Sequence, residues 1–158
     1  MTTLTANWIW RAGDPAPRNV LMQFRKTFSL AARPAQARLH ISADTRYFLT
    51  VNGVRVGYGP ARNYHFHYEY DTHDLAPYLR AGLNIIAVAV SHWGEATFQQ
   101  MAGRGGLLAQ LDLDGQTRLR TDAGWKVNSS VAVVQNTPRI ACQLPWEEQV
   151  DGRLEDQG

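Results

Sequence analysis

Cysteine is nearly absent from this chain, which has one, Cys142, among 158 residues. A single cysteine cannot close an intrachain disulfide, so packing and hydrogen bonding must hold the fold together. A chain of this length can bury a sizeable core without such cross-links, and it suits one domain. For Cys142 itself we expect the environment of a small buried hydrophobe rather than that of a reactive thiol.

Long apolar runs are also missing. No stretch approaches the roughly 20 apolar residues of a membrane-spanning helix. The first residues, MTTLTANWIWRAG, lack the basic and apolar regions of a signal peptide. The sequence therefore predicts a soluble chain without a membrane partner and without an export signal in these residues, and it leaves the compartment open.

Charge of one sign is not concentrated in any segment. The chain has 16 lysines and arginines against 14 aspartates and glutamates, a formal net charge of +2, and the two signs are interspersed. No run of basic residues reaches the length of an arm that binds nucleic acid. We therefore expect no polyanionic partner, and in particular no nucleic acid.

What the chain does have is alternation of apolar and polar residues with period 2, the pattern of β-strands. Tyr47, Leu49 and Val51 alternate in this way, and Asn52-Gly53 follows where a two-residue hairpin needs two positive φ angles. Asp114-Gly115 is a second hairpin signal of the same kind. Further strands are predicted over 19–30, 37–43, 54–56, 66–70, 85–90, 105–112, 117–120, 125–127, 131–134 and 140–144.

One short helix is expected among the strands. Residues 71–79 are predicted to form a capped helical turn, in which Asp71 or Asp74 accepts hydrogen bonds from free backbone N–H groups. Roughly nine or ten strands with a single short helix predict an all-β fold, a jelly-roll β-sandwich. We expect a single domain over residues 1–158 with its core at about 8–146, because the sequence beyond turns polar as at a domain boundary.

Several of these pieces occur together in a known family. A strand ending in VNG, a second ending in Gly59-Pro60, the pair Tyr70-Asp71, and L-x-x-G-x-N before an apolar strand resemble the N-terminal β-sandwich of bacterial α-L-rhamnosidases, a galactose-binding-like jelly roll. The flanking segments fall in the same order, so that the resemblance covers about residues 8–127. These segments are WIW at 8–10, FRKTFSL at 24–30, ARLHISADTRY at 37–47, RGGLLAQLDL at 104–113 and TDAGWKV at 121–127.

The resemblance implies a non-catalytic module within a larger multidomain glycosidase. In the rhamnosidases the catalytic carboxylates lie on a separate α/α barrel, so this chain alone is not expected to be an enzyme, whereas its parent protein is expected to be a glycoside hydrolase. The catalytic domain of the same polypeptide is then the expected partner, against which the module packs. The resemblance also implies an architectural role for Asn52-Gly53, Gly59-Pro60, Asp71, Gly82 and Asn84.

Two segments carry side chains suited to carbohydrate. Sugar rings pack their C–H faces on aromatic side chains, and their hydroxyl groups need planar polar partners. If the loop before residue 66 and the residues after the central strand lie at one end of the sandwich, they form a shallow carbohydrate site. Its candidate residues are Arg62, Asn63, Tyr64, His65, His92, Trp93 and Glu95, whereas Trp8, Trp10, Trp125 and Trp146 are expected in core or interdomain packing.

Two alternatives to a carbohydrate-binding module stay open. One is a purely structural interdomain module without a ligand. The other is a cupin-like metal-dependent enzyme, because His65 and His67 at i and i+2 on a strand can ligate one metal ion, although the second cupin motif has no counterpart downstream. Calcium needs several converging oxygen ligands, and no motif supplies them, so no cofactor is predicted. The aspartates considered for calcium are Asp14, Asp44, Asp71 and Asp74.

Overall fold

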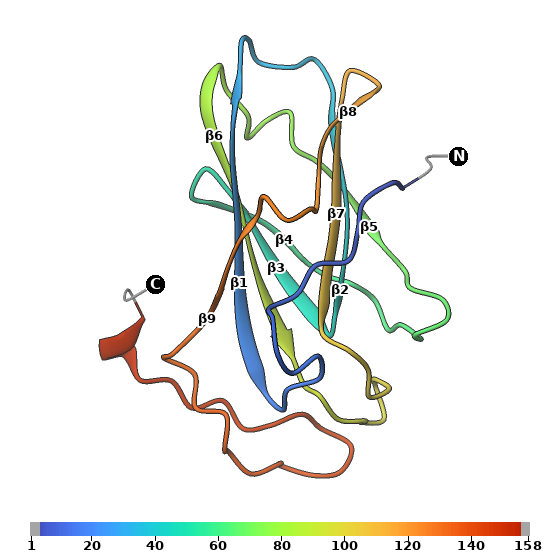
Figure 1. Ribbon diagram of the computed structural model, residues 1–158, viewed down its shortest axis with the longest axis vertical. Helices are drawn as coiled ribbons and strands as arrows, with labels where there is room; N and C mark the ends of the chain where they lie inside the picture. Colours follow the sequence, from blue (N-terminus) through green and yellow to red (C-terminus); the bar gives the residue numbers. More distant parts are fainter. Residues whose placement is uncertain (1–3, 156–158) are drawn as a thin grey trace.

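The computed structural model describes residues 4–155 and places nine strands of this range in two antiparallel sheets that face each other (Figure 1). The five-stranded sheet has the order β4 (Val54–Gly59), β3 (Arg46–Val51), β6 (Gly82–His92), β1 (Val20–Leu30) and β9 (Lys126–Ser129). The four-stranded sheet has the order β5 (Asp71–Asp74), β2 (Ala37–Asp44), β7 (Gly106–Leu113) and β8 (Gln116–Arg120). The predicted all-β sandwich is confirmed.

The core lies between the two sheets. It consists of the apolar side chains that occupy every second position of the strands and point inward. On β6 the inward side chains of Ile86, Val88 and Val90 are at most 2% exposed. They belong to one buried cluster with side chains of the facing sheet, such as Leu39 and Leu111. β1 pairs with β6 over the full length of both strands, so this ladder forms the spine of the five-stranded sheet.

Both predicted hairpins are present. Asn52 and Gly53 have φ angles of 50° and 82°, and Asp114 and Gly115 have φ angles of 49° and 82°. Two successive positive φ angles define the two-residue turn that matches the twist of paired strands. The hairpins join β3 to β4 and β7 to β8.

The asparagine of the first hairpin also ties the hairpin to the start of β6. Asn52 Nδ2 donates to Asn84 Oδ1 at 2.9 Å and to the Tyr78 carbonyl at 2.9 Å. Asn52 Oδ1 accepts from Ile85 N at 2.9 Å, while the fully buried Asn84 donates to the Arg80 carbonyl at 2.7 Å. Because buried amide groups need hydrogen-bond partners, this Asn52–Asn84 pair accounts for the asparagines of the VNG and G-x-N pieces.

A second polar cluster explains Gly59 and Asp71. Tyr47 Oη donates to Asp71 Oδ2 at 2.6 Å and lies 2.8 Å from His73 Nε2. A Cβ atom on Gly59 would collide with Asp71 Oδ2, so glycine at the end of β4 leaves room for the cluster. Burial raises the pKa of Tyr47, with a further contribution from Asp71, and burial lowers the pKa of His73. The phenol and the imidazole are therefore both neutral at neutral pH.

A strand replaces the first half of the helical turn predicted over 71–79. Its four residues form β5, which pairs with β2 so that Asp74 lies opposite Arg38. The prediction is wrong over 71–74, because this pairing joins segments far apart in sequence, and such pairing overrides local preference. The cap is confirmed at Asp74, whose Oδ1 accepts a hydrogen bond from Ala76 N at 3.0 Å where a single turn begins.

Three other predicted strands are not found in the described part of the chain: 66–70, 131–134 and 140–144. Backbone pairing near them is limited to isolated bridges, such as that of Val133 with Val150. Of the aromatic residues at 66–70, Tyr70 lies beside the outward-facing His40 of β2, with ring centres 5.6 Å apart. The helical residues between 4 and 155 form η1 (Gly152–Leu154), and no helix in this range has the length and hydropathy needed to cross a bilayer.

Replacing Asn84 with alanine tests the Asn52–Asn84 pair. We expect Asn84→Ala to lower the free energy of unfolding by about 2–4 kcal/mol, because several buried donors and acceptors lose their partners at once. Denaturant titration followed by tryptophan fluorescence measures the change. Asn136→Ala, which truncates an exposed asparagine, should change this free energy by less than about 0.5 kcal/mol. Equal effects of the two substitutions would refute the role given to the pair.

Candidate functional site

Loops and terminal segments gather at one end of the sandwich, where β6 ends and β1 and β7 begin (Figure 1). Asn19 N donates to the Trp93 carbonyl at 3.2 Å, which joins the segment before β1 to the loop after β6. Trp146 Nε1 donates to the same carbonyl at 2.8 Å, and the guanidinium carbon of Arg18 lies 3.8 Å from the centre of the Trp146 ring. These contacts hold the C-terminal segment at what we call the loop end.

An open cleft of about 900 Å³ lies at the loop end. The Trp8 ring packs against Tyr68 at 4.6 Å between ring centres, and the Trp10 ring packs against His92 at 5.4 Å. We call this opening beside the two tryptophan rings the tryptophan cleft. Its lining includes Trp8, Trp10, His65, Tyr68, Gly94 and residues 102–105.

Glycines let the tryptophan rings lie directly against the backbone of this cleft. The N-terminal segment pairs with the start of β7 through two backbone hydrogen bonds of 2.9 and 3.0 Å. A Cβ atom on Gly105 would collide with the Trp10 ring, and one on Gly106 would come within 2.6 Å of the Trp8 ring. The glycines at 105 and 106, which directly precede the paired Leu107, therefore leave the room that the rings of the WIW segment occupy.

Asp44 lies behind the wall of the tryptophan cleft. Its side chain is buried, accepts a hydrogen bond from Tyr68 Oη at 3.1 Å, and lies 3.0 Å from His92 Nδ1. Thr45 Oγ1 donates to the same carboxylate at 3.3 Å. Burial raises the pKa of Tyr68, and the Asp44 carboxylate raises it further, so the phenol keeps its proton and donates. With both oxygens engaged, Asp44 positions Tyr68 and His92.

The predicted carbohydrate residues of the β4–β5 loop fall into two environments. Arg62, Tyr64 and His65 are exposed, and His65 lines the tryptophan cleft. Asn63 is buried, and its Oδ1 accepts a hydrogen bond from Glu69 N at 2.6 Å. Asn63 therefore shapes the loop from inside and does not face a ligand.

The predicted residues after β6 divide in the same way. His92 is buried beside Asp44, and Trp93 is half-buried with its carbonyl engaged in the loop end. Glu95 is exposed, and its carboxylate pairs with Arg139 at 3.2 Å. The two segments share one end of the sandwich, as a joint site requires, but His65 is the one candidate residue that lines the tryptophan cleft.

His65 and His67 are not arranged as the histidines of a cupin. Tyr64 and His67 exchange backbone hydrogen bonds, so that His65 and Phe66 form the tip of a turn instead of part of a strand. His67 Nε2 lies 3.6 Å from a Glu69 carboxylate oxygen. Within residues 4–155, which include the four aspartates considered for calcium, no three side chains of histidine, cysteine, aspartate or glutamate converge as metal ligands.

The expectation of a buried Cys142 is wrong, because its side chain is exposed. Cys142 lies on the C-terminal segment, where the Arg139 guanidinium donates to the Cys142 carbonyl at 2.7 Å. Among the tryptophans expected in packing, Trp125 and Trp146 are buried, whereas Trp8 keeps 42% of its surface exposed. The exposed Trp8 lies in the lining of the tryptophan cleft.

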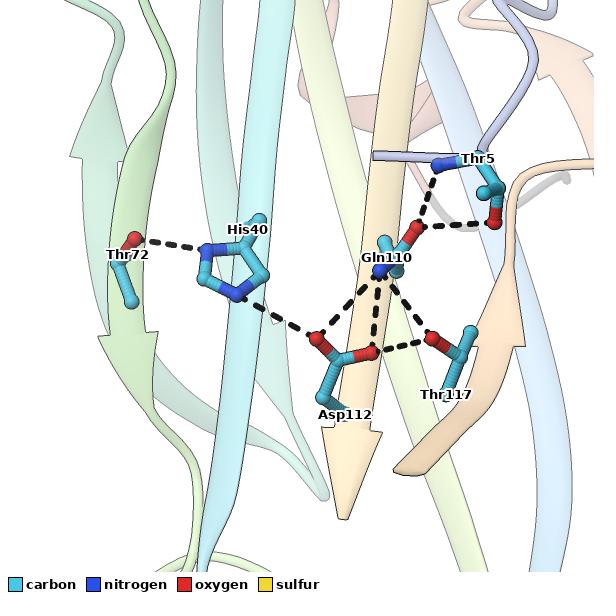
Figure 2. Close-up of polar contacts among 6 residues, drawn as sticks. All are labelled: Thr5, His40, Thr72, Gln110, Asp112 and Thr117. Carbon is cyan, nitrogen blue, oxygen red and sulfur yellow. Dashed lines mark hydrogen bonds and ion pairs between the residues drawn. The ribbon is translucent and has the colours of Figure 1, made fainter. Parts of the chain in front are cut away.

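Sequence reasoning missed a polar network on the outer face of the four-stranded sheet (Figure 2). His40 Nδ1 lies 2.9 Å from Thr72 Oγ1, and His40 Nε2 lies 3.6 Å from Asp112 Oδ2. Gln110 Nε2 donates to Asp112 Oδ1 at 3.1 Å, and Gln110 Oε1 accepts from Thr5 N at 2.8 Å. The network ties β5, β2 and β7 to the N-terminal segment.

The Thr72 hydroxyl, the His40 imidazole and the Asp112 carboxylate are lined up in this order in space. The same three groups make up a nucleophilic triad. Here the imidazole-to-carboxylate distance of 3.6 Å exceeds that of a hydrogen bond, and His40 is buried. The three side chains therefore connect β5, β2 and β7. A signal for it existed in the sequence, because His40 is a polar residue on the outward face of β2, and Gln110 and Asp112 are polar residues two apart on the outward face of β7.

The fold and the loop end define this chain as a β-sandwich module of the jelly-roll kind, with its aromatic cleft built from loops at one end. The chain belongs to the family of α-L-rhamnosidase N-terminal domains, because the protein-family model described as "Alpha-L-rhamnosidase N-terminal domain" matches residues 32–158. The resemblance drawn from the sequence is thereby confirmed, and the match includes the tail after residue 127, which that resemblance did not cover.

Solved structures give the same result. The GH78 family rhamnosidase of Bacillus sp. GL1 matches with a TM-score of 0.94 and 40% identity, over 99% of this chain and 17% of that chain. The α-L-rhamnosidase from Aspergillus terreus matches with a TM-score of 0.66 and 29% identity, over 88% of this chain and 17% of that chain. This chain therefore spans about 17% of the length of these rhamnosidases.

A lectin is also similar to this chain. The lectin from Pleurotus ostreatus, solved in complex with GalNAc, matches with a TM-score of 0.59 and 28% identity, over 93% of this chain and 42% of that chain. No curated protein matches the sequence.

Alanine at Gly105 tests the packing of the tryptophan cleft. We expect Gly105→Ala to displace the Trp10 ring, to shift the tryptophan emission, and to lower the free energy of unfolding by about 1–3 kcal/mol through overpacking. Gly152→Ala is the matched control, because a Cβ atom there meets no atom within 4 Å. Fluorescence spectra and denaturant titrations measure both variants. An unchanged spectrum and stability for Gly105→Ala would show that the cleft does not need a glycine wall.

Proposed function

We propose that this chain is the non-catalytic N-terminal module of an α-L-rhamnosidase-like glycoside hydrolase, and that its loop end packs against the catalytic domain of the same polypeptide. One observation carries the proposal. The match with the Bacillus sp. GL1 rhamnosidase covers 99% of this chain, but it covers only 17% of the rhamnosidase chain. The larger part of such an enzyme lies outside the matched region. We take residues 1–158 as one domain of that longer protein.

The chemistry of the tryptophan cleft supports a non-catalytic role. Glycoside hydrolysis uses two carboxyl groups in the substrate cleft, ~5 Å apart for retention and ~6.5–9.5 Å apart for inversion. The residues that line the tryptophan cleft include no aspartate or glutamate. The nearby Asp44 is buried and already holds Tyr68 and Thr45.

Exposed aromatic side chains near the tryptophan cleft support a protein interface. Phe66 is 83% exposed and Phe98 is 69% exposed. Phe66 follows His65 on the β4–β5 loop, and Phe98 lies on the β6–β7 loop, and both loops contribute to the cleft wall. Exposed apolar patches on soluble proteins mark interaction sites, so a domain docked here would cover side chains that are costly to leave in water.

Mixing experiments test the docking. This chain and the remaining part of its reading frame, produced separately, should associate in analytical ultracentrifugation. Phe66→Asp should weaken association at least about tenfold, because it places a charge in an apolar contact. Val54→Asp is the matched control, since Val54 is also exposed and follows the hairpin turn at the far end of β3.

Activity supplies the second arm of this test. Hydrolysis of an aryl α-L-rhamnoside should require the remaining part of the polypeptide and should be undetectable with this chain alone. Turnover by this chain, or equal weakening by Phe66→Asp and Val54→Asp, would overturn the proposal.

Carbohydrate recognition at the rim of the tryptophan cleft is a second candidate function. The Tyr64 and Phe66 rings stack with centres 5.6 Å apart and planes 16° apart, and the Arg62 guanidinium carbon lies 5.7 Å from the Tyr64 ring centre. This exposed stack offers an aromatic face and a planar donor together, which suits a sugar ring and its hydroxyl groups. The similar lectin, solved with GalNAc, also supports this candidate.

Titration with L-rhamnose and rhamnose-containing oligosaccharides tests the rim. We expect binding heats from this chain, and a Tyr64→Ala variant that binds at least about fivefold more weakly, a loss of about 1 kcal/mol. Tyr70→Ala is the matched control, because Tyr70 is similarly exposed but lies over the four-stranded sheet beside His40. Binding that is insensitive to Tyr64→Ala would place the sugar elsewhere.

A further inference from the structure

The outer face of the five-stranded sheet carries a second open surface, which shares no lining residue with the tryptophan cleft. Two rows of side chains cross the strands of this face in register. The first row is Tyr58, Phe48, Ala89, Gln23 and Asn128. The second row is Arg55, Thr50, Ala87, Arg25 and Lys126.

Small residues hollow the middle of this face. Ala87 and Ala89 on β6 form a floor between the larger side chains of Phe48 on β3 and Arg25 on β1. The hollow has a volume of about 520 Å³. This volume lies within the range of about 300–1,000 Å³ that is usual for small-ligand sites. We call it the alanine furrow.

Charge on this sheet has one sign. The five strands contain no aspartate or glutamate, whereas they contain Arg25, Lys26, Arg46, Arg55 and Lys126. The four-stranded sheet, by contrast, mixes the two signs, because it contains four aspartates and also Arg38, Arg118 and Arg120. The charged side chains of the five-stranded sheet are therefore all cationic, whereas those of the four-stranded sheet nearly balance.

The cations of the alanine furrow are free to meet a ligand. Arg25 and Lys126 are exposed, and neither takes part in an ion pair within residues 4–155. The furrow lining includes no acidic residue. Lys26, the neighbour of Arg25, points to the other side of β1 and pairs with Asp122 at 3.4 Å. The furrow thus offers two uncompensated positive charges to a partner of opposite charge.

We propose that the alanine furrow binds an acidic oligosaccharide, whose sugar units bear carboxylate groups. The proposal rests on the proposed function of the chain as a module of a glycan-degrading enzyme. The planar guanidinium of Arg25 matches a carboxylate in a bidentate arrangement, and Lys126 adds a second charge. Alanine side chains on the floor leave room for a ring between the cations and the aromatic side of the furrow.

Aromatic and amide groups complete the match to a saccharide. Phe48 is 43% exposed, and its ring centre lies 6.5 Å from that of Tyr58. These rings form a platform for the C–H face of a sugar. Gln23 and Asn128, at the opposite side of the same row, supply both donors and acceptors for hydroxyl groups.

The composition of the furrow favours a saccharide over a protein partner. Interface cores between proteins are depleted of charge and rich in large apolar side chains. The alanine furrow instead combines small apolar residues with amides and cations across four strands, β3, β6, β1 and β9. A neutral sugar would leave both cations unused, so a carboxylated one fits the whole site.

Calorimetric titration of this chain with trigalacturonate at low ionic strength tests the proposal. We expect binding that is at least about tenfold tighter than that of the neutral galactose trisaccharide of the same linkage. The double variant Arg25→Gln/Lys126→Gln should bind trigalacturonate about tenfold more weakly. Binding should also weaken in 0.5 M NaCl, because exposed charges are screened.

A matched control removes the same charge from the other sheet. Arg38→Gln/Arg118→Gln neutralises two exposed arginines of β2 and β8 and should leave trigalacturonate binding unchanged. Phe48→Ala should weaken binding as well, since it removes the platform. Thermal melting verifies that each variant is folded.

The proposal would be overturned by equal affinity for the neutral trisaccharide, by equal losses in the two double variants, or by tighter binding of a thymidine hexanucleotide than of trigalacturonate. Rhamnosidase activity of the complete polypeptide without trigalacturonate binding would reject the furrow and keep the proposed function. Trigalacturonate binding without such activity would keep the furrow and reject the proposed enzyme.

Discussion

Two asparagine side chains set the alignment on which the rest of the sandwich depends. Asn52 lies in the β3–β4 turn, Asn84 lies at the start of β6, and each amide is bonded to the other and to nearby backbone. Because the donors and acceptors of an amide have fixed places, the pair admits one register between the hairpin and β6. A slip of one residue would turn Val88 and Val90 out of the core. The alignment of the central strand is therefore determined at the end where that strand begins.

The loop end is built on a different principle. Its segments are joined by single contacts, such as those to the Trp93 carbonyl, and by rings that rest on glycine backbone, such as Trp10 on Gly105. Such an end can change its loops without disturbing the strands, which suits contacts that differ from one protein to another. The buried Asp44 joins the two parts, because it ends β2 and also holds Tyr68 of the cleft wall.

Much of the fold could be predicted because hairpins and alternation are local signals. Asn52-Gly53 determines its own turn, and the period of β1 and β6 identifies their inward faces. β5 could not be predicted in this way, because only its pairing with the distant β2 makes it a strand. The site was harder still. Asn63 and His92 have side chains suited to sugar, but residue type does not reveal that both are buried.

The charge of the molecule shows why composition alone gives little information about partners. A net charge of +2 averages over the whole chain, and on that average a polyanionic partner is not expected. The strands distribute the same residues unevenly, with aspartates and arginines mixed on the four-stranded sheet and uncompensated cations such as Arg25 and Lys126 on the outer face of the other. A partner is attracted by the local arrangement of charges and not by their sum, because salt largely screens the interaction between charges that are more than about 10 Å apart. Binding chemistry in a two-layer fold is therefore a property of each face, and the register of the strands, which decides the face of each side chain, also decides the charge that a partner meets.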